Sequence, residues 1–145
     1  MRLLIQRVQT ANIKIDNEII SEIQQGLLVF IGIHQEDSED NVDYLVKKLV
    51  NLRIFEDENN KMNLSIKDVN GSLLLVSQFT LYADCTRGNR PDFIQAAKPE
   101  KAILLYNSFV EKAKKSGLHT ETGVFAADMK INLVNDGPIT IFLER

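Results

Sequence analysis

The sequence predicts one α+β domain spanning residues 1–145, with a mostly antiparallel or mixed β-sheet and two main helices. Its length of 145 residues fits one domain and leaves little room for two. Two stretches place apolar residues at helical spacing, whereas short alternating or wholly apolar runs fill most of the remaining chain. Because the predicted strands outnumber the helices and do not alternate strictly with them, we expect α+β organisation.

The first third of the chain is predicted to be β-structure. Residues 2–8 and 10–15 are interpreted as two strands. The second strand alternates polar residues with Ala11, Ile13 and Ile15. Such alternation is typical of a half-buried strand, and Asp16-Asn17 supplies a turn after it. Residues 27–33 are almost entirely apolar, which predicts a central strand buried on both faces.

A helix is predicted next, with Ser38 as its N-cap. Its apolar stripe consists of Val42, Leu45, Val46, Leu49, Val50 and Leu52. Beyond a polar loop, Asn70-Gly71 is a hairpin signal. It leads into residues 72–81, which we interpret as a second buried strand.

Residues 82–98 form a long polar loop, and loops of that length in small domains are often functional. Pro99 suits the first turn of the second helix, and Gly117 suits its end. The last third is β again, with strands predicted at 129–133 and 139–143.

Composition limits the function classes. The net charge of −3 and pI of about 5.4 disfavour broad adhesion to nucleic acid. A local basic patch stays open: Arg87, Arg90, Lys98 and Lys101 form either a phosphate-contacting surface or an ordinary solvated face. The single cysteine, Cys85, excludes an intramolecular disulfide. No apolar run is long enough for a signal peptide or a membrane span, so we expect a cytoplasmic protein.

Ser77, Gln78 and Thr80 are polar residues at the end of an apolar strand. They either mark the exit of that strand into solvent or form a polar floor under a substrate carbonyl. Thr80 would need a base to act as a nucleophile, but His34 and His119 lie far from it in sequence. We therefore favour positioning and electrostatic roles for Thr80 over covalent attack.

Other residues are weaker candidates for a functional role. Gly137-Pro138 is either an ordinary trans turn or a rigid backbone feature whose carbonyls point into a site. Cys85 is interpreted as incidental, because the neighbouring Asp84 raises rather than lowers a thiol pKa. The histidines and carboxylates show no metal-ligand spacing, so no metal site is expected.

Six stretches, in order along the chain, resemble the bacterial form of the D-aminoacyl-tRNA deacylase family. They are Gln6-Arg7-Val8; Gly26-Leu27-Leu28-Val29; Arg53-Ile54-Phe55 with Lys61-Met62-Asn63-Leu64; Ser77-Gln78-Phe79-Thr80-Leu81; Thr122-Gly123-Val124-Phe125-Ala126-Ala127-Asp128-Met129; and Asn135-Asp136-Gly137-Pro138-Ile139-Thr140. At Ala126 some members carry glycine, a variation expected to affect pocket width.

The resemblance implies a barrel-like homodimer that hydrolyses the ester between a D-amino acid and tRNA, without a metal or organic cofactor. It implies that the Gly137-Pro138 bond is cis and reaches into the active site of the other subunit. There its carbonyls would capture the substrate α-ammonium and exclude the side chain of an L-amino acid. Glycyl-tRNA would then also be accepted.

The resemblance also implies roles for individual residues. The backbone N–H groups of Phe79 and Thr80 would hold an oxyanion, and the ribose 2′-hydroxyl of the RNA would assist hydrolysis. The expected catalytic residues are Gln78 and Thr80. The expected substrate-binding residues are Ser77, Phe79, Phe125, Ala126 and Met129. Arg7 and Asn135 are expected to support the Gly137-Pro138 loop.

Two other functions compete with this hypothesis. One is a non-catalytic RNA-binding or assembly protein, which the acidic pI and the lack of an aromatic-basic motif disfavour. The other is a conventional threonine or cysteine hydrolase of small esters, which the lack of a recognisable triad disfavours.

Overall fold

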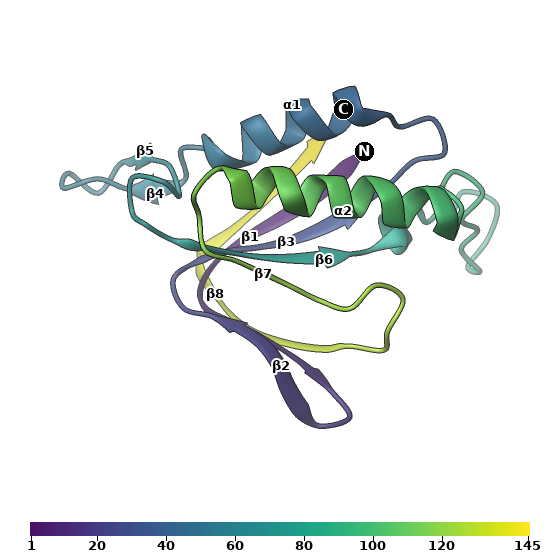
Figure 1. Cartoon of the computed structure of the whole chain (residues 1–145), viewed down its shortest axis with the longest axis horizontal. Helices are drawn as coiled ribbons and strands as arrows, with labels where there is room; N and C mark the ends of the chain where they lie inside the picture. Colours follow the sequence, from purple (N-terminus) through teal and green to yellow (C-terminus); the bar gives the residue numbers. More distant parts are fainter.

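The computed structural model describes residues 1–145, which form eight strands, two α-helices and one 3-10 helix. In chain order these are β1 (Arg2–Ile15), β2 (Glu18–Ile23), β3 (Gly26–Gly32), α1 (Glu39–Val50), β4 (Phe55–Glu56), β5 (Met62–Leu64), β6 (Ser72–Ser77), the 3-10 helix η1 (Phe79–Tyr82), α2 (Pro99–Lys115), β7 (Thr120–Thr122) and β8 (Lys130–Glu144). Figure 1 shows α1 and α2 side by side on one face of the sheet.

The long strand β1 organises the sheet. One edge of β1 pairs antiparallel with β8 from Arg2↔Glu144 to Lys14↔Lys130. Its other edge pairs antiparallel first with β3 and then with β2. The two strands expected at 2–8 and 10–15 are therefore one continuous strand, which pairs with β8 along both halves and changes partner only on its other edge.

Beyond β3 the sheet becomes parallel, with β6 beside β3 and β7 beside β6. The far end curls back, because Ser21 Oγ on β2 donates a hydrogen bond to Thr122 O on β7 at 3.1 Å. The mixed sheet is thus a nearly closed barrel. β3 and β6 approach closely at Gly26, where a Cβ atom would lie 1.9 Å from Ser72 O.

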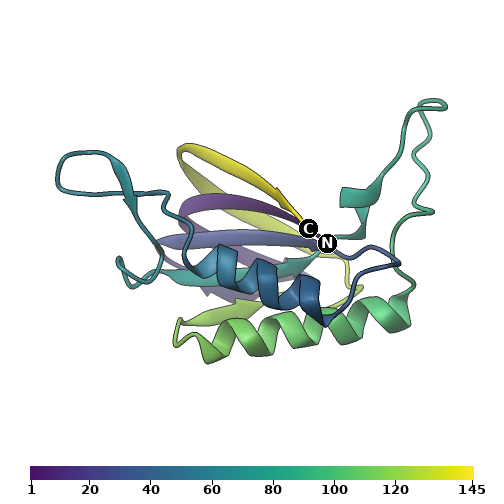
Figure 2. The same cartoon turned by 90° about the horizontal axis from the view of Figure 1, so that it is seen from above.

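The apolar runs in β3 and β6 separate two cores, as their burial on both faces predicts. Leu27, Val29 and Ile31 face the helices and join the larger core, together with Phe109 of α2. Leu28 packs instead into a smaller core inside the barrel. Figure 2, seen from above, shows the helical layer beside the sheet, with two loops projecting at its ends.

The two helices begin and end close to the residues that the sequence predicts. α1 begins after Ser38, whose backbone N–H donates to Asn41 Oδ1 at 2.9 Å. α2 starts at Pro99 and ends at Lys115, just before Gly117, which adopts φ +85°. Neither helix combines the length and apolar content that a membrane span requires.

Two predicted strand features are wrong. Asn70-Gly71 does form a turn, but not a hairpin, because the following strand β6 pairs parallel with β3. The strand expected over 72–81 ends at Ser77, and Phe79–Tyr82 is a 3-10 helix. Of that helix only Tyr82 is buried, so its apolar side chains do not continue a strand.

The C-terminal third also differs from expectation. β7 lies outside the predicted strands, since Thr120–Thr122 is short and polar and its strand character comes from pairing with β6. The strands expected at 129–133 and 139–143 are two arms of β8, which remains extended through Gly137 and Pro138.

Candidate active site

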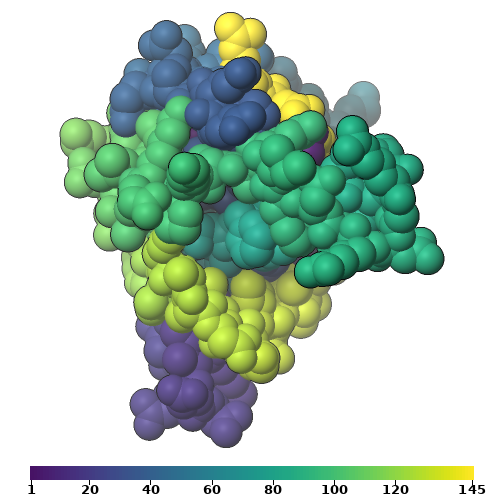
Figure 3. All heavy atoms as spheres, turned by 90° about the vertical axis from the view of Figure 1, so that its right-hand side faces the viewer, coloured from purple at the N-terminus to yellow at the C-terminus, as the bar shows by residue number.

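A cavity of about 620 Å³ opens where β3 and β6 end. It is lined mostly by apolar side chains from the strand ends, the start of α2 and the loop before β8. The lining residues are Ile31, Ile33, Val76, Ser77, Gln78, Phe79, Phe93, Ala96, Ala97, Pro99, Ala102, Phe125, Ala126, Ala127, Asp128, Met129 and Ile131. Figure 3 looks onto this end of the molecule, where a recess lies between the green and yellow-green segments.

The floor of the cavity forms where β6 gives way to η1. Ser77 is the last residue of β6, and Gln78 N still donates to Ile31 O at 2.8 Å. The chain then turns into η1, so Phe79 projects with 57% of its surface exposed. Polar groups at the end of a buried strand thereby face an apolar cavity.

Thr80 lies beside the cavity but does not line it. Its hydroxyl accepts a hydrogen bond from Gln78 Nε2 at 2.5 Å, and no histidine or carboxylate contacts it. His34 stacks against Tyr82, with ring centroids 5.2 Å apart, and His119 pairs with Glu121 at 3.3 Å. The hydroxyl of Thr80 therefore has a positioning partner and no general base.

η1 is held from the far side by Arg2. The guanidinium of Arg2 donates through Nη1 to Leu81 O at 2.9 Å and lies 4.3 Å from the centre of the Tyr82 ring. It also pairs with Glu144 at 2.7 Å. These contacts fix the backbone of η1 relative to the ends of β1 and β8.

The loop before β8 supplies the opposite wall. Gly123 N donates to Leu75 O at 3.0 Å, which ties the loop to β6. Ala126 adopts φ +61°, a left-handed conformation that is unfavourable for a residue with a Cβ atom. This turn brings Phe125, Ala126 and Met129 to the cavity.

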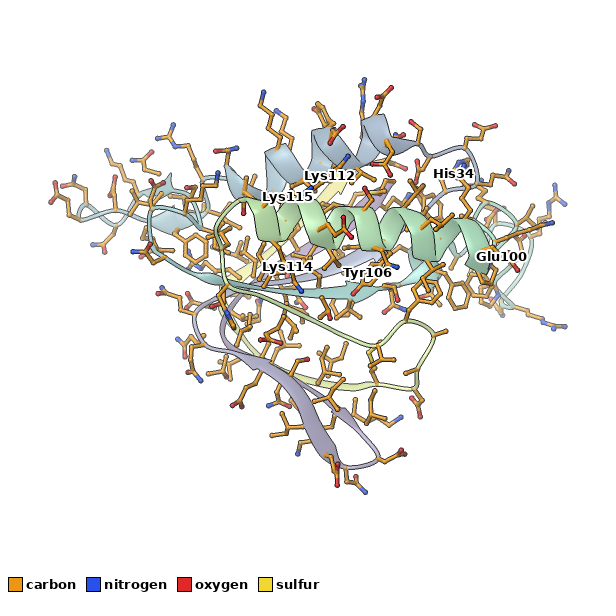
Figure 4. All side chains as sticks on the ribbon, in the orientation of Figure 1. His34, Glu100, Tyr106, Lys112, Lys114 and Lys115 are labelled. Carbon is orange, nitrogen blue, oxygen red and sulfur yellow. The ribbon has the colours of Figure 1, made fainter.

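Tyr106 braces this wall from α2. Its hydroxyl donates to Leu75 O at 2.9 Å, and its ring lies 6.0 Å from that of Phe125. Burial raises the pKa of the Tyr106 hydroxyl to about 12, so the donor stays protonated at neutral pH. Figure 4 labels Tyr106 between α2 and the sheet.

Gly137 and Pro138 lie elsewhere, at an irregularity in the β1–β8 ladder. The register passes from Gln6↔Thr140 to Val8↔Asn135, so Arg7 alone stands opposite residues 136–139. The Gly137-Pro138 peptide bond is cis, and Gly137 adopts φ +121°. This outward step of the backbone does not line the cavity of its own chain.

Arg7 anchors that step. Its side chain is only 5% exposed, and its Nη1 donates to Ile54 O at 2.7 Å. Its Nε lies 3.0 Å from Asp136 Oδ2, an ion-pair distance, although the N–H is not aligned for a hydrogen bond. Asn135 Nδ2 donates to both Arg7 O and Ile139 O, which bridges the base of the step.

The structure thus separates the predicted site residues into two groups. Six line the cavity: Ser77, Gln78, Phe79, Phe125, Ala126 and Met129. Thr80 adjoins them, whereas the remaining four surround the backbone step: Arg7, Asn135, Gly137 and Pro138. Within the 145 residues no three potential metal ligands cluster.

Sequence reasoning missed the roof of the cavity. Phe93 lines it and meets Phe79 edge-on, with centroids 4.9 Å apart. Phe93 is an aromatic residue within an otherwise polar loop, a signal that could have identified it. The small residues Ala96, Ala97 and Ala102 carry no comparable signal.

Comparison with known proteins gives a consistent picture. Residues 4–144 match the protein family described as D-Tyr-tRNA(Tyr) deacylase. A D-aminoacyl-tRNA deacylase from Dictyoglomus turgidum is 54% identical, covering 99% of this chain and 92% of the relative. One from Clostridioides difficile is 53% identical, covering 99% and 97%.

Two solved structures share the fold. One, described as a c-Myc DNA unwinding element binding protein, has a TM-score of 0.93 at 41% identity and covers 100% of this chain and 99% of its own. The other is described as a probable eukaryotic D-amino acid tRNA deacylase. Its TM-score is 0.87 at 16% identity, with 98% and 97% covered, so it supports the fold alone.

Proposed function

The chain belongs to the D-Tyr-tRNA(Tyr) deacylase family, and on that premise we propose that it hydrolyses the ester bond of D-aminoacyl-tRNA, releasing tRNA and the free D-amino acid. The observation that carries the proposal is the cavity at the ends of β3 and β6. Its apolar walls suit an amino-acid side chain, and its polar floor suits the ester. Because charged tRNA is used in translation, we assign the reaction to the cytoplasm.

Stabilisation of the tetrahedral intermediate is assigned to the backbone of η1. Phe79 and Thr80 open this helix, so their N–H groups have no intrahelical acceptor. Two such donors at the cavity floor suit a carbonyl oxygen that gains negative charge. Gln78 and Thr80, bonded to each other, orient the ester against these donors.

The nucleophile in this mechanism is water. Water adds to the ester carbonyl, the bond from the carbonyl carbon to the ribose oxygen breaks, and that oxygen leaves with a proton. No histidine or carboxylate is hydrogen-bonded to the Thr80 hydroxyl, which supports assistance by the ribose 2′-hydroxyl of the substrate over a threonine nucleophile. Cys85 is exposed and outside the cavity lining, which weighs against a thiol mechanism.

Chiral selection is assigned to Gly137 and Pro138 of a second copy in a homodimer. Since they do not line the cavity of their own chain, they can act on substrate only at another. β8 is an edge strand with Val134 and Phe142 about half exposed, which supports contact between copies. Glycyl-tRNA, with no side chain to exclude, is accepted as well. Arg7 and Asn135 hold the shape of the loop.

One assay tests the proposed function. Purified protein is incubated with D-Tyr-tRNA, L-Tyr-tRNA and glycyl-tRNA, and release of the amino acid is followed. We expect cleavage of the D-ester and the glycyl ester while the L-ester survives. Cleavage of none rejects the enzyme, and equal cleavage of both Tyr esters rejects the chirality mechanism. Sedimentation of the same sample measures whether it is dimeric.

A further inference from the structure

The loop after η1 forms a projecting hairpin, which comprises residues 84–92. Asp84 N donates to Asp92 O at 2.9 Å, and Asp92 N donates to Asp84 O at 3.0 Å, which closes its base. All seven residues between them are exposed. Figure 2 shows this segment extending away from the sheet at the end opposite β4 and β5.

The tip of the hairpin is positively charged, whereas Asp84 and Asp92 at its base carry the opposite charge. Its tip carries Arg87 and Arg90 without an acidic residue, whereas the whole chain has a net charge of −3. No carboxylate in the 145 residues lies within ion-pair distance of either guanidinium.

The nearest acids are engaged by the backbone. Asp84 Oδ1 accepts from Thr86 N at 2.8 Å, a bond that lowers the pKa of the Asp84 carboxyl. Asp92 Oδ1 accepts from Ile94 N at 3.3 Å. The charge of Arg87 also lowers the pKa of the Asp84 carboxyl, but neither arginine forms an ion pair, so both can bind an anion from solution.

The base of the hairpin lies at the mouth of the cavity. Phe93 follows the hairpin directly, lines the cavity and packs against Phe79. The chain after it is pinned to the end of the sheet, because Gln35 N donates to Gln95 O at 3.0 Å and Ala97 N donates to Ile33 O at 2.8 Å. A ligand that leaves the cavity on this side passes the hairpin.

The proposed substrate supplies an anion of the right form. An ester held in the cavity belongs to the terminal nucleotide, and its RNA strand carries a further phosphate for each nucleotide that precedes it. Guanidinium groups bind phosphate oxygens through paired hydrogen bonds. Two exposed arginines on one short hairpin can therefore bind phosphates of the same strand.

We propose that Arg87 and Arg90 bind the phosphate backbone of the single-stranded 3′ end of tRNA while its aminoacyl ester occupies the cavity. The inference rests on the proposed function and names the surface that receives the RNA. Such contacts hold the substrate without reading its sequence, so they act equally on tRNAs that carry different amino acids.

The test compares Arg87→Ala/Arg90→Ala with Lys114→Ala/Lys115→Ala. The control pair removes the same charge from exposed, unpaired lysines at the far end of α2, labelled in Figure 4. Each variant is assayed on D-Tyr-tRNA across salt concentrations and on D-tyrosyl adenosine, which has the ester but no phosphate.

We expect the arginine variant to lose roughly 10- to 50-fold in kcat/KM on D-Tyr-tRNA at 0.1 M salt, through KM. For this variant, the slope of log kcat/KM against log salt concentration should become less negative by about 1.5. Its rate on D-tyrosyl adenosine should match that of the wild-type protein. The lysine variant should behave as wild type.

Three results would overturn the proposal that this surface binds RNA. They are an unchanged kcat/KM of the arginine variant on D-Tyr-tRNA, an equal loss of kcat/KM in the lysine variant, and a matching loss of the arginine variant on D-tyrosyl adenosine. Failure of the proposed function is distinguishable, because wild-type protein would then cleave neither D-ester.

Discussion

The cavity end and the backbone step on β8 are built in opposite ways. The cavity is a half-open apolar space whose polar groups, Ser77 and Gln78, stand at a strand end beside an exposed helix turn. The step is a short backbone detour held from beneath by a buried arginine. The difference teaches that an apolar space can be formed by side chains alone, whereas a backbone detour needs a buried charged side chain to hold its shape.

The largest effect should come from Arg7→Ala. Removing this side chain leaves Ile54 O and Asp136 without their buried partner, and should lower the free energy of unfolding by about 2–4 kcal/mol. Urea unfolding measures the loss. The control Lys130→Ala removes an exposed pair with Asp128 and should cost under about 0.5 kcal/mol. Equal losses would mean that the step is not anchored as described.

The second-largest effect should come from Gly137→Ala. At φ +121° a Cβ atom would lie 2.8 Å from Ile139 Cγ1 and 3.1 Å from Ile139 N, so the step must change shape. We expect a loss of about 2 kcal/mol and a lower ratio of D- to L-ester cleavage. Gly117→Ala is the matched control, because Gly117 has φ +85° and open space around its Cβ position. If both variants keep full selectivity, the step has no role in chirality.

At the cavity end, Thr80→Ala should have a smaller effect. Thr80 is exposed and bonded only through Gln78, so we expect kcat/KM to fall less than about tenfold with stability unchanged. Thr80→Ser, which keeps a hydroxyl, is assayed beside it on D-Tyr-tRNA. If activity falls to background in Thr80→Ala but is retained in Thr80→Ser, the result would indicate that Thr80 is the nucleophile.

The smallest effect should be that of Ala126→Gly. Removing the Cβ atom from a left-handed residue should raise the free energy of unfolding by about 1–2 kcal/mol. The greater conformational freedom of glycine in the unfolded chain should lower it by about 0.4–1 kcal/mol. Thermal unfolding should therefore show a net gain in stability of roughly 0–1.6 kcal/mol. Ala127→Gly, at a neighbour without positive φ, should show no gain, and a destabilised Ala126→Gly would contradict the conformational argument.

Prediction from sequence succeeded where local pattern decides structure. The stripes of α1 and α2 and the doubly buried β3 need only their own residues to be identified. Prediction from sequence failed where pairing with a segment distant in the sequence determines the structure. Asn70-Gly71 makes a turn locally, but only β3 determines that the next strand pairs parallel.

The candidate site divides in the same way. The polar strand end at Ser77 and Gln78 is visible in the sequence, whereas Phe93 reaches the cavity only through a tertiary contact with Phe79. Arg7 is one of several polar residues in β1, and its burial becomes interpretable only once Asp136 and Ile54 are found beside it. The resemblance to a family supplied that placement in advance, but residue patterns did not.

The pairing of β1 with β8 joins the first strand of the sheet to the last. Arg2 is matched with Glu144 and Lys14 with Lys130, so one edge of β1 has no partner until the final strand exists. During synthesis, β1 can pair with β2 and β3 early, but its remaining edge has no partner until β8 has been synthesised. Contacts this distant in sequence slow folding, and they make the pairing of β8 the event that completes this edge of β1.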